Sequence, residues 1–192
     1  MSDAPQTEDE ELTLVTAAIA GDRAAFTRLY DLHYDRIYRH VLYRVRSVQD
    51  AEDLSQQVFL QAWRAMERYR PTGAPFVAWL FTIAHNLTMS FYRHNKLDRR
   101  QEGDNELELE GVVAEGDPEE QAEARVDQDR VRAAIVKLRP EQQLVVSLRF
   151  LENLSHHDIA ETLGKSEGAV RVIQHRALQE LRRIMEREGA NG

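Results

Sequence analysis

Apolar residues recur at spacings of three and four along most of the chain, which is the period of an amphipathic α-helix. In the first half they predict a short helix from residue 12 that ends at Gly21, and a longer helix capped by Asp22. The inward face of the longer helix holds Phe26, Leu29, Tyr30, His33, Ile37 and Val41. No stretch indicates a strand, so we predict an all-α fold.

A third helix begins at a capping box formed by Ser47 and Asp50. Its predicted inward residues are Ala51, Leu54, Val58 and Ala62. Its predicted outward residues are Gln49, Asp53, Gln56 and Leu60, with Asp50 and Gln57 beside them. Leu60 on this acidic, polar face is either a scattered surface apolar residue, which is common, or part of a contact with another protein.

The segment YRPTGAP at residues 69–75 contains two prolines and a glycine and predicts a loop. The helix after it has an apolar stripe of Phe76, Trp79, Leu80, Ile83, Leu87 and Phe91. Its far side is expected to present His85, Met89, Tyr92 and Lys96, with Asn86 and Arg93 on the flank. Such polar, aromatic and basic groups suit single-stranded nucleic acid, although a solvated helix face would show the same pattern.

Residues 154–184 have the pattern of a helix-turn-helix. Ser155 and Asp158 form a capping box, Gly164 ends the first helix and Ser166 caps the second. The second helix has an inward stripe of Val170, Ile173, Ala177, Leu181 and Ile184. Its opposite face holds Gly168, Arg171, Val172, His175, Gln179 and Arg182, with Arg176 on the flank. A tight glycine turn before a helix that is basic outside and apolar inside predicts a DNA-reading element.

The formal net charge of −8 is unusual for a DNA-binding protein, but many of the acidic residues are concentrated in two segments of the chain. Residues 1–11 hold five acids and no bases, and residues 98–129 hold thirteen acids and three bases, which leaves 22 bases against 15 acids elsewhere. We therefore predict a disordered tail (1–11), a helical domain (12–97), a flexible acidic linker (98–126) and a second helical domain (127–188). Helix resumes near Asp127, and Pro140 suits a first helical turn that is followed by the apolar series Leu144, Val145, Leu148 and Leu151.

Several kinds of chemistry are not supported by the sequence. The chain has no cysteine, which excludes thiolate zinc sites and fits a reducing cytoplasm, and no run long enough to span a membrane. It also lacks a phosphate-binding loop and a metalloprotease pattern. The adjacent His156, His157 and Asp158 are expected to be a solvated helix start, because neighbouring residues point in different directions. We expect no metal, no cofactor and no enzymatic activity.

With these features in hand, the chain resembles a bacterial RNA polymerase sigma factor of the extracytoplasmic-function (ECF) type, in the sigma-70 family. DAEDLSQQVFLQAW (residues 50–63) resembles the polymerase-binding helix of that family, and FVAWLFTIAHNLTMSFYRH (residues 76–94) resembles its −10 promoter helix. LRPEQQLVVSLRFLENLSHHDIAETLGKSEGAVRVIQHRAL (residues 138–178) resembles its −35 module. The resemblance covers nearly everything outside the tail and the linker.

The resemblance implies a protein that directs core polymerase to promoters. The residues implied to meet the clamp helices of the largest catalytic subunit are Asp50, Asp53, Gln56, Gln57 and Leu60. Many relatives carry glutamate where this chain has Gln57. The loop of residues 69–74, with Tyr69, Thr72 and Gly73, would hold a flipped −10 base, and Asn86 would reach the same strand. His85, Met89, Tyr92 and Arg93 are added to the −10 set from helix geometry.

In the second domain, the resemblance places the helix of residues 167–183 in the major groove at the −35 element. The implied −35 set is Ser166, Gly168, Arg171, Val172, His175 and Arg176. Arginine can grip guanine O6 and N7 with two hydrogen bonds. Val172 is either a contact to a thymine methyl group or simply a surface valine.

Further partners implied by the resemblance are the flap of the other large polymerase subunit and an anti-sigma factor. The acidic linker is either a solvated spacer or a chain that lies in the basic RNA channel. Two alternatives are a sigma-like DNA-binding regulator that does not program polymerase and a protein-interaction adaptor. The intact segment of residues 50–63 argues against the regulator, and the segregated charge with Arg171 and Arg176 argues against the adaptor.

Overall fold

The computed structural model describes residues 8–45, 47–102 and 130–189. Within these ranges the chain forms helices and short connections and no strand, which confirms the all-α prediction. The chain divides into two compact units, Met1–Glu110 and Gly111–Gly192. Each unit has its own buried apolar residues.

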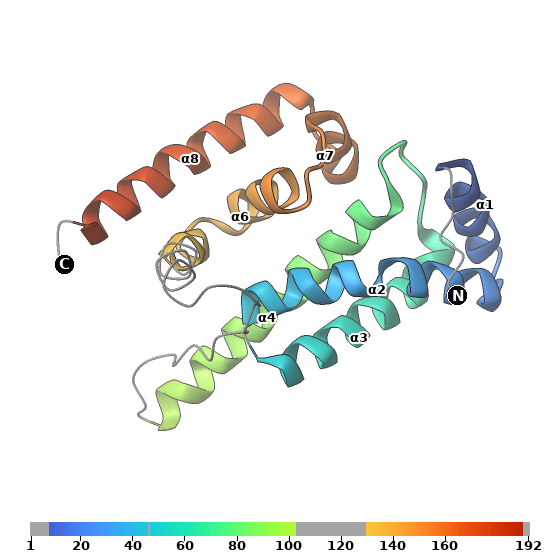
Figure 1. The fold of residues 1–192 in the computed structure, drawn as a ribbon, viewed down its shortest axis with the longest axis horizontal. Helices are drawn as coiled ribbons and strands as arrows, with labels where there is room; N and C mark the ends of the chain where they lie inside the picture. The colour runs from blue at the N-terminus through green and yellow to red at the C-terminus, as the bar shows by residue number, and fades with distance from the viewer. Residues whose placement is uncertain (1–7, 46, 103–129, 190–192) are drawn as a thin grey trace, which may run out of the picture. The chain divides into compact units, whose positions relative to one another are not determined.

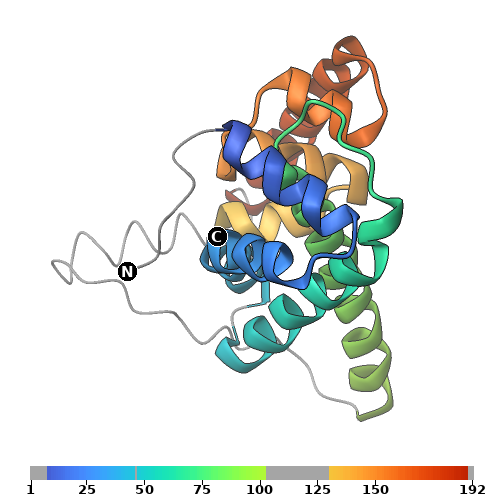
Figure 2. The same ribbon diagram turned by 90° about the vertical axis from the view of Figure 1, so that its right-hand side faces the viewer.

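The first unit contains α1 (Glu8–Ile19), α2 (Arg23–Val45), α3 (Val48–Ala65), a 3₁₀ turn η1 (Met66–Arg68) and α4 (Phe76–Glu102). Helices α2, α3 and α4 pack against one another, and α1 packs on α2 and η1 (Figure 1 and Figure 2). Their shared core includes Leu29, Ile37, Val41, Val58, Leu80 and Phe81, all of which are buried.

The predicted caps of α2 and α3 and the predicted inward face of α3 are confirmed. Oδ1 of Asp22 accepts hydrogen bonds from the backbone N–H groups of Ala24 (2.8 Å) and Ala25 (3.2 Å), which caps α2. Oγ of Ser47 accepts from the N–H of Asp50 at 3.2 Å and caps α3. The predicted inward residues of α3 (Ala51, Leu54, Val58 and Ala62) are all buried.

The predicted tail (1–11) is wrong at its end, because α1 already begins at Glu8, and residues 1–7 lie outside the described residues. The predicted stripe of α4 is shifted, since Trp79, Ile83, Leu87 and Phe91 are half-buried whereas Phe81, Ala84 and Thr88 are fully buried.

Helix α4 extends to Glu102, beyond residue 97, where we expected the first domain to end. Residues 98–102 are DRRQE, most of which lose little side-chain freedom in a helix, and the first glycine follows only at position 103. The high charge of residues 98–102 led us to predict a linker there, although the same residue types favour a helical backbone. The remainder of the predicted linker and the expected helix start at Asp127 lie outside the described residues.

The described part of the second unit contains helical residues 130–136, α6 (Pro140–Val146), the π-helical turn η2 (Ser147–Leu151), α7 (His156–Leu163) and α8 (Glu167–Gly189). Pro140 occupies the first turn of α6, as predicted. Helix α8 packs on α6 and α7. One buried cluster joins the segment before α6, the end of α6 and α8, and it consists of Ala134, Ile135, Leu138, Val146, Ala177, Leu181 and Ile184.

The π-helical turn interrupts the apolar series that starts in α6. Leu144 and Leu148 are buried, whereas Leu151 is 41% exposed and its neighbour Phe150 is 54% exposed. A π turn has wider spacing than the α-helical period from which the series was read. The α-helical spacing therefore correctly predicts burial up to Leu148 but not at Leu151.

Gly164 provides a test of this local structure, since it ends α7 in the left-handed conformation with φ of 62° and ψ of 38°. A Cβ at this position would meet nothing within 4 Å, so the cost of Gly164→Ala comes from the backbone conformation alone. We expect this substitution to lower the free energy of unfolding of the second unit by about 1–2 kcal/mol. Urea unfolding followed by amide hydrogen exchange in α7 and α8 measures the change.

Gly168→Ala is the matched control for Gly164→Ala. Gly168 lies in the first turn of α8 without a positive φ, and an added Cβ would be 3.9 Å from Oγ of Ser166. This substitution should leave the free energy of unfolding unchanged or raise it by up to ~1 kcal/mol. Equal stability of Gly164→Ala and the unmodified chain would contradict the role given to the left-handed turn.

Candidate functional site

The outward face of α3 is exposed over two helical turns. Asp53, Gln56, Gln57 and Leu60 are exposed, and Asp50 is half-buried at the first turn beside its capping partner Ser47. Leu60 has 48% of its surface accessible, although Val58 and Ala62 on either side of it in sequence are fully buried. The structure thus brings the five predicted polymerase-contacting residues onto the solvent side of one helix.

The loop between η1 and α4 is anchored at Tyr69 and open at its tip. The half-buried ring of Tyr69 has its centroid 4.5 Å from that of Trp79 and meets Phe76 edge-on at 5.5 Å. Burial, and then the negative charge of Glu11 on α1, raise the pKa of the Tyr69 hydroxyl, so it stays protonated. Thr72 and Gly73 are exposed at the tip, and Gly73 adopts a φ of 90°.

The outward residues of α4 differ in how far they reach solvent. Asn86 and Arg93 are exposed, whereas Met89 and Tyr92 are half-buried. The hydroxyl of Tyr92 donates a hydrogen bond to the backbone carbonyl of Arg44. Of the −10 residues predicted on this helix, Asn86 and Arg93 therefore offer accessible polar groups.

The prediction that His85 lies on the exposed side of this helix was wrong. His85 is 3% exposed, and its Nδ1 lies 2.8 Å from Nη1 of Arg44. Because a guanidinium can only donate, Nδ1 must accept, and the neutral ring then carries its proton on Nε2. His85 and Tyr92, two turns apart on α4, both bind the end of α2. His85 is thus a buried packing residue that fixes α2 against α4.

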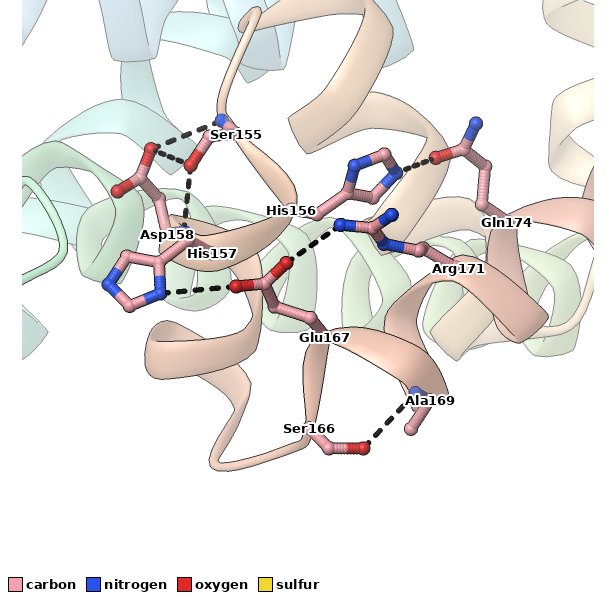
Figure 3. Close-up of polar contacts among 9 residues, drawn as sticks. All are labelled: Ser155, His156, His157, Asp158, Ser166, Glu167, Ala169, Arg171 and Gln174. Carbon is pink, nitrogen blue, oxygen red and sulfur yellow. Dashed lines mark hydrogen bonds and ion pairs between the residues drawn. The ribbon is translucent and has the colours of Figure 1, made fainter.

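The helix-turn-helix is assembled as the sequence predicted (Figure 3). Oγ of Ser155 accepts from the N–H of Asp158 at 3.0 Å, and Oδ2 of Asp158 accepts from the N–H of Ser155 at 3.1 Å. Oγ of Ser166 accepts from the N–H of Ala169 at 3.2 Å and caps α8. The predicted reading residues of α8 are all exposed: Gly168, Arg171, Val172, His175 and Arg176.

The two histidines at the start of α7 point to different residues of α8. Nε2 of His156 lies 2.7 Å from Oε1 of Gln174, which ties the two helices together. Nδ1 of His157 lies 3.5 Å from Oε1 of Glu167 (Figure 3). As expected, these adjacent side chains do not converge on one point. Over the described ranges of the chain, no group of histidine and acidic side chains has an arrangement that could hold a metal ion.

Glu167 is a residue of this site that the sequence interpretation missed. Its Oε2 accepts from Nη2 of Arg171 at 2.9 Å, one helical turn away. This hydrogen bond is the largest cause of a lowered pKa of the Glu167 carboxyl, and the charges of Arg171 and His157 act in the same direction. The spacing of four between an acid and a following base was the available signal.

Two family models match the chain, and each match lies within one of the two units. The model for Sigma-70 region 2 matches residues 29–97. The model for Sigma-70, region 4 matches residues 134–183, which include α6, α7 and most of α8.

In the described parts of the chain, no helix has the length and apolar content needed to cross a membrane.

Curated relatives and a solved structure extend these matches over most of the chain. It is 37% identical to the ECF RNA polymerase sigma factor BldN of Streptomyces coelicolor over 174 residues, which are 91% of this chain and 65% of BldN. It is 33% identical to the ECF RNA polymerase sigma factor SigD of Mycobacterium tuberculosis over 180 residues, which are 91% of this chain and 84% of SigD.

The fold is similar to that of CnrH in the structure of its complex with the cytosolic domain of CnrY. The TM-score is 0.61 at 25% identity, and the match covers 91% of this chain and 96% of CnrH.

Proposed function

We propose that this chain, which belongs to the extracytoplasmic-function type of RNA polymerase sigma factor in the sigma-70 family, binds core polymerase and directs it to promoters by contacting the −35 and −10 elements. One observation carries the proposal: an exposed polar face on α3 and a helix-turn-helix with an exposed basic face occur in the same chain. A regulator that only binds DNA needs the second feature and not the first, so the regulator is the weaker candidate.

In this proposal α3 binds the clamp helices of the largest polymerase subunit. Asp50 and Asp53 supply negative charge, Gln56 and Gln57 supply neutral hydrogen-bonding groups, and Leu60 supplies an apolar contact at the C-terminal end of this face. The exposed apolar residues Phe150 and Leu151 after α6 belong to the domain that would bind the flap of the other large subunit.

The −10 element is assigned to the loop after η1 and to the accessible face of α4. A base flipped from the duplex would enter the loop at Tyr69, Thr72 and Gly73, where the packed ring of Tyr69 provides a rigid wall. Asn86 and Arg93 would contact the same melted strand, and Met89 and Tyr92 would border it. His85 is not part of this set, because it is buried.

Replacement of Asn86 tests the −10 assignment. We expect Asn86→Ala to reduce open-complex formation about tenfold, the size of one lost base contact of ~1.4 kcal/mol. Permanganate footprinting of the −10 region measures the open fraction. The comparison uses a template that is already unpaired at the −10 element. If the defect persists on this template, Asn86 contacts the unpaired base. If the defect disappears, Asn86 acts in the unpairing of the duplex. Full activity on both templates would contradict the assignment.

The −35 element is assigned to α8, whose exposed residues Gly168, Arg171 and Val172 lie in its first turns, where a recognition helix meets base edges. Ser166, His175 and Arg176 complete the proposed set. The functional division we propose is a −10 and polymerase-binding domain that begins with α1 at Glu8 and ends with α4 at Glu102, a connecting segment, and a −35 domain that includes residues 130–188.

The protein acts in this proposal by binding alone, without catalysis or a cofactor, and in the cytoplasm beside the polymerase it programs. We also propose a protein inhibitor of the anti-sigma class as a partner. This extension is supported by the solved structure of CnrH, which is a complex with the cytosolic domain of CnrY.

The decisive experiment is co-purification with bacterial core RNA polymerase, followed by run-off transcription from a promoter library. A stable holoenzyme with new start sites supports the proposal and reports the promoter motif. Binding to DNA without binding to core polymerase would replace it with the regulator.

A further inference from the structure

We propose that Glu167 is a specificity-determining residue of the −35 reader: it positions the guanidinium of Arg171 toward a guanine edge and weakens the attraction of that guanidinium to phosphate. This inference rests on the proposed function, because it requires α8 to enter the major groove. Glu167 acts in it through Arg171 and is therefore a positioning residue.

The carboxylate of Glu167 is held from two helices. Oε2 accepts from Arg171 at 2.9 Å within α8, and Oε1 lies 3.5 Å from Nδ1 of His157 on α7 (Figure 3). Side-chain exposures are 43% for Glu167 and 62% for Arg171, so both groups remain open to a ligand. The acid thus lies on the surface beside the arginine that we propose reads a base.

The geometry leaves Arg171 able to read a base. A guanidinium has five N–H donors, and the contact with Glu167 uses Nη2. The donors that remain include those needed for the paired acceptors O6 and N7 of guanine. Holding one edge of the side chain also removes, before DNA arrives, part of the rotamer freedom that an arginine loses on binding.

The charge of the pair favours base contact over phosphate contact. The hydrogen bond from Arg171 lowers the pKa of Glu167, which is therefore ionised at neutral pH and offsets the positive charge of its partner. A phosphate placed beside Arg171 would also lie near this carboxylate and be repelled by it, whereas a neutral base edge would not. Arg171 therefore contributes to discrimination between sequences more than to general affinity for DNA.

The test uses holoenzyme formed from the full chain and core polymerase, with Glu167→Gln as the variant. The amide keeps the size of the side chain and removes its charge. Affinity is measured for promoters in which each −35 base pair is changed in turn, and for unrelated DNA over a series of salt concentrations. We expect discrimination at the position read by Arg171 to fall on the order of tenfold. Affinity for unrelated DNA should rise and show a steeper dependence on salt.

Glu180→Gln is the matched control, because Glu180 lies on the same helix and pairs with Arg183 at 3.5 Å. It makes the same charge change and should raise affinity for all sequences alike, with discrimination unchanged. A double variant tests whether Glu167 acts through Arg171. In the Arg171→Ala background, Glu167→Gln should cause no further loss of discrimination between −35 sequences.

The outcomes separate this inference from the proposed function. Unchanged discrimination in Glu167→Gln, or a further loss in the Arg171→Ala background, would overturn the role of Glu167 while leaving the sigma assignment in place. An unmodified chain that forms no holoenzyme, or a holoenzyme with no −35 preference, would overturn both. Circular dichroism of each variant distinguishes a loss of fold from a loss of recognition.

Discussion

Asp53→Arg is expected to abolish holoenzyme formation while both helical units stay folded. Asp53 is exposed in the middle of α3, on the side opposite the buried Leu54 and Val58, so the longer side chain displaces no core residue. If the clamp surface is basic, the substitution replaces an attractive pair with like charges, which costs several kcal/mol at a binding interface, or a weakening of roughly 100-fold or more. Fluorescence anisotropy of labelled protein titrated with core polymerase measures the loss.

Glu52→Arg is the control for this prediction. It makes the same change of charge at the neighbouring position of α3, where the exposed Glu52 lies near Tyr34 of α2. Burial is the main cause of the raised pKa of the Tyr34 hydroxyl, and the charge of Glu52 contributes to it. Because Glu52 lies toward α2 rather than on the proposed contact face, its replacement should weaken core binding only a few-fold. Equal binding by Asp53→Arg and the unmodified chain would remove α3 from the polymerase interface.

Arg171→Ala is expected to cost about 1–3 kcal/mol of discrimination at one −35 position and to relax specificity there. The large effect follows from the two hydrogen bonds that a guanidinium makes to guanine, both of which alanine loses. Competition binding of the holoenzyme to promoters with single −35 changes gives the discrimination at each position. Weakening that is uniform across all sequences would instead identify a phosphate contact.

Arg171→Lys distinguishes the shape of the side chain from its charge. Lysine keeps the positive charge but lacks the planar fork that matches two acceptors at once. We expect Arg171→Lys to retain most of the affinity for unrelated DNA and to lose much of the discrimination. Full discrimination with lysine would mean that position 171 is read through charge alone.

The sequence predicted the parts of the fold that depend on local chemistry. Capping by Asp22, Ser47 and Ser155, and the left-handed turn at Gly164, follow from hydrogen bonds and backbone preferences within a few residues. The faces of α3 and α8 follow from apolar spacing, because each helix packs one side on its own unit. The placement of the exposed candidate residues on these helices was predictable for the same reason.

The sequence did not predict features that depend on distant or irregular structure. His85 is polar and was expected at the surface, but its partner Arg44 lies 41 positions away, and helical period does not reveal such a pair. The exposure of Leu151 depends on a π-helical turn that the α-helical period does not describe. Glu167 was a different case, since its spacing from Arg171 was visible and only its importance was overlooked.

If α8 reads the −35 element as proposed, its separation into a packed side and an exposed side would make promoter choice an exchangeable property of this protein. Val170 and Ala177 are fully buried, whereas Arg171, Val172 and His175 between them are exposed. Substitutions confined to such exposed positions usually change stability by no more than ~0.5 kcal/mol. A library randomised at these three residues would therefore yield many folded proteins, from which synthetic sigma factors that serve separate promoters in one cell could be selected.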